Sequence, residues 1–149
     1  MQYSEGQVGR VFTVRIDDRE DLIRELQRFV VAMKIQNGII HFLGAARSAR
    51  VATGPREAAI PPIPRHEEIL GGWELLGLAT IYPGEDGPSI HLHTAAGRGI
   101  RALSGCLKDR AEVYVVIEAI IIEFIGISAK RLPDRRVGVD LPVFDQVLP

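Results

Sequence analysis

The chain has 149 residues, of which 46% are hydrophobic and 25% are charged, a balance typical of soluble globular proteins that bury a core without disulfides. The net charge is −1, from 18 basic and 19 acidic residues, which argues against a protein that depends on phosphate contacts. A single cysteine excludes an intrachain disulfide, and no basic and apolar leader is present, so we expect a cytoplasmic protein.

The first two elements are predicted by a change in hydrophobic period. Residues 9–17 alternate between apolar and polar side chains, which indicates a half-buried strand. From about residue 18 to residue 35, apolar side chains recur every three or four positions. This spacing predicts an amphipathic helix, with Asp17 or Asp18 as its N-cap.

The next segment combines strand signals with a proline-rich loop. Residues 39–44 form an apolar run typical of an interior strand, and we interpret His41 within it as a hydrogen-bonded core residue. Residues 45–54 predict a turn followed by another strand. Four prolines make 55–66 a surface loop, which ends at His66.

The second half of the chain is predicted to be mostly β-structure. Residues 73–82 are strand-like, and the Pro- and Gly-containing stretch 83–88 indicates a turn. Residues 112–125 follow a break at 108–110 and are apolar on both faces, which predicts two strands or one bent strand buried on both sides. Glu118 lies in the middle, so we expect it at a bend that reaches water, in an ion pair or in a functional site.

The C-terminal part and the most apolar run set two further expectations. Residues 128–149 predict a short strand and then an extended tail, 133–149, that docks on its own domain or on a neighbouring subunit. The most apolar run, 117–127, is interrupted by two glutamates and is too short to cross a membrane. We therefore expect one domain over 1–149, with its core at about 8–132 and no membrane partner.

The strongest chemical signal is a His-x-His pair on a predicted strand. Side chains alternate along a strand, so His91 and His93 project from the same face. A turn centred after Gly97 pairs His93 with Ala102 and leaves Cys106 diagonal to His91 on that face. A slip of one residue would send the thiol to the opposite face.

Two imidazoles and a thiolate form a donor set that suits zinc. Three protein ligands with one open position are typical of reactive zinc sites, and the candidates for a fourth ligand are His66, Glu118 or a water molecule. The alternative is that His91 and His93 are polar residues on a solvated strand face and that Cys106 is a small buried filler.

Several short motifs occur in a characteristic order along the chain. They are Gly9-Arg10-Val11-Phe12 followed by an amphipathic helix, Phe42-Leu43-Gly44-Ala45, Glu74-Leu75-Leu76-Gly77, His91-Leu92-His93, Ser104-Gly105-Cys106-Leu107, and Val116-Ile117-Glu118 to Ile122-Glu123. Together, from about residue 8 to residue 144, they resemble the PPC (plants and prokaryotes conserved) domain family. This resemblance implies an α+β fold, in which one major helix packs on a strongly bent, mainly antiparallel sheet, and it implies a homotrimer.

The resemblance also bears on the site and on DNA binding. Many prokaryotic members of the family have Gly-Gly-His where this chain has Ser104-Gly105-Cys106, and the exchange keeps a zinc-competent donor. Plant members bind DNA through AT-hooks, but Gly97-Arg98-Gly99 lacks the second arginine and the proline of that motif. DNA binding would have to use five other arginines, which we interpret as solvated surface charges: Arg47, Arg50, Arg131, Arg135 and Arg136.

Three functional hypotheses follow. The first is a homotrimeric zinc-binding module with a regulatory or sensing role, whose metal ligands are His91, His93 and Cys106. The second is a zinc-dependent hydrolase or lyase that uses Glu118 or Glu74 as general base. The third is a DNA-binding or nucleic-acid-associated protein, which the family name suggests and the charge does not support.

Overall fold

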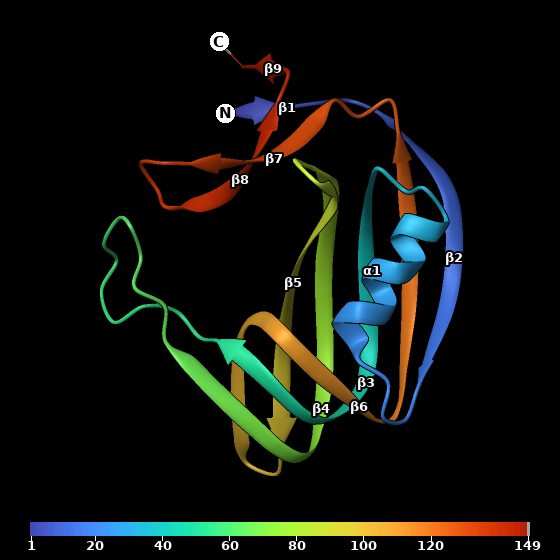
Figure 1. Ribbon diagram of the computed structural model, residues 1–149, viewed down its shortest axis with the longest axis vertical. Coiled ribbons are helices and arrows are strands. Elements are labelled where there is room, and N and C mark those ends of the chain that lie inside the picture. Colours follow the sequence, from blue (N-terminus) through green and yellow to red (C-terminus); the bar gives the residue numbers. More distant parts are fainter. Residues whose placement is uncertain (149) are drawn as a thin grey trace.

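The computed structural model describes residues 1–148, which form antiparallel strands and one short helix (Figure 1). The elements are β1 (Gln2–Tyr3), β2 (Gln7–Asp17), α1 (Leu22–Ala32), β3 (Asn37–Ala52), β4 (His66–Gly84), β5 (Gly87–Arg98), β6 (Arg101–Ile125), β7 (Ala129–Asp134), β8 (Val139–Phe144) and β9 (Gln146–Val147). The main sheet has the order β2-β6-β3-β4-β5, and β6 also pairs with β5. This additional pairing makes the sheet curl into a barrel-like form.

Helix α1 is shorter than the sequence predicts. It begins at Leu22 because Asp21 is extended (φ −95°, ψ 114°) and its side chain accepts a hydrogen bond from the Arg24 N–H. The predicted caps, Asp17 and Asp18, are wrong, since Asp17 still belongs to β2 and pairs there with β6. One face of the helix contributes three fully buried side chains to the same hydrophobic cluster as the sheet: Leu22, Leu26 and Val30.

Strand β3 runs without interruption through the region where the sequence predicts a turn. A register shift between Ala46 and Ser48 lets the strand bend while it stays paired with both β4 and β6. His41 is exposed, so its interpretation as a core residue is wrong. Its neighbours Ile40 and Phe42 are buried, and His41 points away from the core because it alternates with them. The described residues contain no helix that is long and apolar enough to cross a bilayer.

Strand β6 is one bent strand of 25 residues. Asp109 and Val115 adopt positive φ values of 62° and 64°, and the strand stays continuous through both. Its second half alternates between buried and exposed residues, so the prediction of burial on both sides is wrong for this chain. Glu118 is exposed and is the register partner of Arg15 on one side and of Leu43 on the other.

The outer face of the sheet carries exposed aliphatic side chains, which we call the outer apolar row. It consists of Leu43, Leu76, Leu78 and Ile120, with exposed fractions of 52%, 67%, 41% and 47%. Leu43 of β3 is the register partner of Leu76 of β4. His41 of β3 lies between Leu78 of β4 and Ile120 of β6 and is the register partner of both. The row is therefore continuous across the middle of the sheet.

The C-terminal segment is more ordered than an extended tail. Strands β7 and β8 form a hairpin that lies against β4, and β9 pairs with β1 at the N-terminus (Figure 1). The hairpin places the side chain of Arg131 in contact with Thr80 and Tyr82 of β4. Only 6% of Arg131 is exposed, which corrects its interpretation as a solvated surface charge.

Candidate metal centre

The β5–β6 hairpin determines where the three donor side chains lie. Its end pair is Arg98 with Arg101, so the turn lies at Gly99 and Ile100, with Gly99 at φ 59°. Cys106 is the direct partner of His93, and the predicted pairing of His93 with Ala102 is wrong. The observed partner of His93, Cys106, lies four positions after the predicted partner, Ala102. Because side chains alternate between the two faces of a strand, an even shift keeps the thiol on the face of the two histidines.

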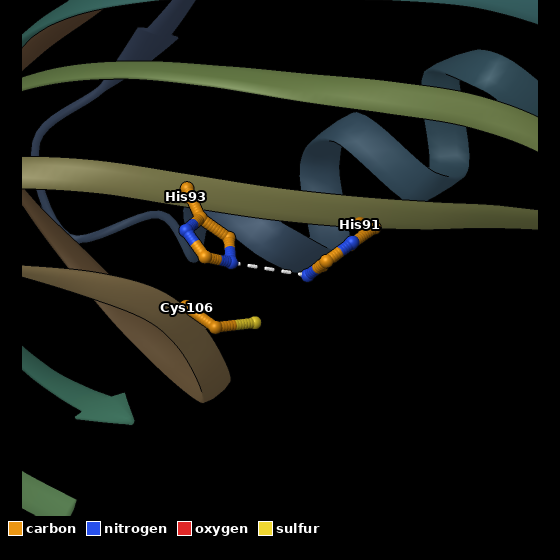
Figure 2. A group of neighbouring side chains, drawn as sticks. All are labelled: His91, His93 and Cys106. Atoms are coloured by element: carbon orange, nitrogen blue, oxygen red, sulfur yellow. Dashed lines mark hydrogen bonds between the residues drawn. The ribbon is translucent and has the colours of Figure 1, made fainter. Parts of the chain in front are cut away.

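Figure 2 shows the side chains of His91, His93 and Cys106 converging from β5 and β6. The two Nε2 atoms are 3.1 Å apart, and the two rings are nearly perpendicular, with an interplanar angle of 81°. The donor atoms of all three residues lie within 4.8 Å of one another. The histidines are exposed and the cysteine is partly buried, so the cluster is accessible from solvent.

Electrostatics favour the neutral form of His91. Partial desolvation of its ring by neighbouring atoms lowers the pKa of His91 below its ordinary value of 6.5, and the positive charges of His93, Arg131 and Lys108 lower it further. A neutral imidazole can donate or accept through Nε2 and is the form that binds metal ions. The site therefore presents at least one imidazole in its ligand form at neutral pH.

The spacing of the two imidazole nitrogens fits a tetrahedral zinc ion. With Zn–N bonds of about 2.05 Å and a Zn–S bond of about 2.3 Å, ligand atoms would lie about 3.3 Å (N to N) and about 3.6 Å (N to S) apart. The observed Nε2 separation of 3.1 Å matches the first value. All three donor atoms lie within 4.8 Å of one another, and the thiol makes only a weak contact with the Leu107 carbonyl, at 3.6 Å, so no strong hydrogen bond holds the sulfur away from the histidines.

Gly105 allows the close strand approach that seats Cys106. A Cβ atom at this position would lie 2.9 Å from the carbonyl carbon of Ala52 and 3.0 Å from the Val51 side chain. These distances are shorter than ordinary carbon contacts of about 3.5 Å. Only glycine therefore lets β6 lie this close to β3 beside the donor cluster.

The structure does not bring the other proposed site residues into this group. His66 pairs with Ala52, which pairs with Cys106 on its other side, so two strand spacings, about 9.5 Å, separate the backbones of His66 and Cys106. Glu118 pairs with β2 and β3 and not with β5. Among the described residues, no carboxylate joins the donor cluster, and neither Glu118 nor Glu74 is placed to act as a base there.

Sequence reasoning missed Arg131 as a neighbour of the site. The only sequence signal for the burial of Arg131 is that it lies two positions after Ala129 on the same strand face, and Ala129 is also buried. On the other side of the cluster, a depression of about 430 Å³ adjoins His93 and is lined in part by His41, Leu78 and Ser104. The donor cluster therefore lies between a buried cation and an open depression.

The whole chain resembles several solved structures. A metal-containing protein from Archaeoglobus fulgidus is 25% identical, with a TM-score of 0.84 over 95% of this chain and 98% of that chain. A plant- and prokaryote-conserved (PPC) protein from Pyrococcus horikoshii is 20% identical, with a TM-score of 0.84 over 100% of both chains. A protein from Bacteroides thetaiotaomicron, described as a candidate DNA-binding protein, is 20% identical, with a TM-score of 0.77 over 98% and 100%.

No curated protein matches the chain significantly. The model of the Plants and Prokaryotes Conserved (PCC) domain matches residues 3–125. That range contains the five-stranded sheet, the helix and all three donor residues. The chain therefore belongs to the Plants and Prokaryotes Conserved domain family.

Proposed function

We propose that this protein is a zinc-binding module with a regulatory or sensing role, and that it assembles as a homotrimer. The zinc ligands are His91, His93 and Cys106, and the fourth position is open to water or to a ligand. The observation that supports this proposal most strongly is the convergence of three zinc-competent donor atoms within 4.8 Å. The similar protein from Archaeoglobus fulgidus is itself described as metal-containing.

The outer apolar row supports self-association. Four large aliphatic side chains on one continuous sheet face are costly to leave in water, and such patches are typical of protein interfaces. The row adjoins the metal centre because Leu78 is the register partner of His93. A second copy of the chain that covers the row would therefore also limit access to the zinc ion.

The geometry does not favour a zinc-dependent hydrolase or lyase. Such an enzyme needs an acid or base beside the metal-bound water, and the donor cluster contains no carboxylate among the described residues. A protein that binds zinc for assembly or for ligand sensing needs no such group.

Direct DNA binding is also less favoured, although the similar Bacteroides protein is described as a candidate DNA-binding protein. Several arginines that reach the surface are occupied by ion pairs: Arg10 with Glu123, Arg47 with Asp18, Arg50 with Asp109, and Arg136 with Asp134. With a net charge of −1, these pairs leave little positive potential for a phosphate backbone.

The metal content of the purified protein tests the proposal. We expect about one zinc ion per chain by elemental analysis, and we expect His93→Ala and Cys106→Ala to lose it. His66→Ala and His41→Ala are matched controls that should keep the metal. A zinc-free protein after purification without chelators, or equal zinc content in all four variants, would contradict the proposed site.

A further inference from the structure

Arg131 is a buried cation without a buried anion. Only 6% of it is exposed, and its Nη2 donates a hydrogen bond of 2.9 Å to Thr80 Oγ1. Its guanidinium carbon lies 5.5 Å from the centre of the Tyr82 ring. The Nε atom is buried and has no hydrogen-bond partner. No carboxylate of the described residues lies within 4.0 Å of the side chain.

This arrangement is unusual for an arginine. Arginine is almost never fully buried unless its charge is paired, because removing it from water is costly. Burial lowers the pKa of Arg131, and the charges of Tyr82, Asp140 and Cys106 offset this lowering only in part. An anion that accepted a hydrogen bond from the guanidinium would offset the cost of this unpaired charge.

The buried guanidinium lies beside the metal centre. Thr80, which accepts its hydrogen bond, is the direct register partner of His91. Partners in an antiparallel pair share a face, with their Cβ atoms about 5 Å apart. The charge of Arg131 acts on both His91 and Cys106, and Lys108 adds a second positive charge near His91.

The net charge of the site therefore selects the kind of ligand. A zinc ion with one thiolate and two neutral imidazoles carries a net charge of +1, and Arg131 and Lys108 increase it to +3. The open zinc position takes oxygen ligands, and the planar guanidinium matches a carboxylate.

We propose that Arg131 and the metal centre together form one binding site for a small carboxylate ligand, whose negative charge is shared between the metal ion and the guanidinium. The proposal rests on the proposed function, since it requires a metal held by His91, His93 and Cys106. It goes beyond that function because it assigns a ligand class and a specificity residue. The module would then sense a small carboxylate.

Cobalt(II) provides a test that does not depend on any enzymatic activity. The Co²⁺-loaded protein should show the visible absorption of a four-coordinate site, and acetate should change this spectrum in a saturable way. Arg131→Gln should still bind Co²⁺, and its dissociation constant for acetate should rise about 10- to 100-fold, as expected for the loss of one charge-assisted hydrogen bond.

Two further variants make the test independent of the folding of Arg131→Gln. Lys108 is exposed, so Lys108→Ala should fold normally and weaken acetate binding about two- to fivefold, because one nearby positive charge is lost. Lys130→Ala is the matched control. It removes the same charge from the residue next to Arg131, but the side chain of Lys130 points to the opposite face of β7. Acetate binding by Lys130→Ala should therefore stay within about twofold of wild type.

The outcomes separate the two proposals. A protein that binds no Co²⁺ overturns both the metal centre and the carboxylate site. A protein that binds Co²⁺ but whose spectrum does not respond to acetate overturns only the carboxylate site. That second result is the one expected if an acidic side chain of a second copy already pairs with Arg131. Equal acetate affinity in wild type, Arg131→Gln and Lys108→Ala also overturns the carboxylate site.

Discussion

Gly105→Ala tests both the pairing of β6 with β3 and the metal centre with a single methyl group. The added Cβ would lie 2.9 Å from the carbonyl carbon of Ala52 and 3.0 Å from a side-chain carbon of Val51. Restoring carbon contacts of about 3.5 Å requires β6 to move away from β3 by at least about 0.5 Å. The obstacle is backbone, which has no rotamer to yield, so we expect a loss of about 2–3 kcal/mol, in the upper range for overpacking.

The matched control is Gly97→Ala in the same hairpin, where an added Cβ meets no atom within 4 Å. Chemical denaturation of the metal-free proteins at equal concentration should show Gly97→Ala within about 0.5 kcal/mol of wild type. With a loss of 2–3 kcal/mol, Gly105→Ala should melt about 5–10 °C below wild type. Its zinc affinity should also fall at least tenfold, because Cys106 moves with the strand. Equal stabilities of the two variants would refute the close approach of β6 to β3 at Gly105.

Three further predictions concern the interface, a strained residue and an ion pair. Leu76→Asp places a charge in the outer apolar row and should shift the protein to monomers in light scattering. Val31→Asp, on the exposed face of α1, should leave the assembly unchanged. A trimeric Leu76→Asp would contradict the proposed interface. Val115→Gly should raise the unfolding free energy by about 0.5–1 kcal/mol, because φ is 64° there and an L-residue is strained; a loss of stability would argue against this conformation. The Arg10 side chain holds the pKa of Glu123 below its ordinary value of 4.5. The ionised carboxylate therefore stabilises the fold above pH 4.5, and this stabilisation is lost as the pH falls through the lower pKa of the folded state. Glu123→Gln should therefore be less stable than wild type at pH 7, with a difference that shrinks below pH 4.5 in urea titrations; a constant difference would show that the ion pair contributes nothing.

The sequence predicted the donor face of the hairpin but not its register. Alternation alone places His91 and His93 on one side, and this holds for any register. The segment Gly97-Arg98-Gly99 offers two places for a tight turn, since either glycine can adopt positive φ. The chain turns at Gly99, which has a φ of 59°, and not at Gly97. No residue pattern in the sequence distinguishes these two places.

The remaining errors have different physical causes. Three aspartates near the start of α1 are competent caps, and only the backbone conformation of Asp21 selects among them. The apolar outer face of β6 was predicted to be buried because composition does not tell whether its own chain or a second copy covers it. Arg131 is interpreted from the sequence as a surface charge because its burial depends on how the β7–β8 hairpin lies on β4, a long-range contact without a local signal.

The position of Arg131 in the chain separates two kinds of evolutionary change. The family model matches residues 3–125, so the three donors lie inside the matched range and the guanidinium lies after it, on the β7–β8 hairpin. Substitutions on the hairpin can therefore remove the guanidinium and leave the three donor residues unchanged. Selectivity for different small molecules would then diversify without any change in the inherited scaffold.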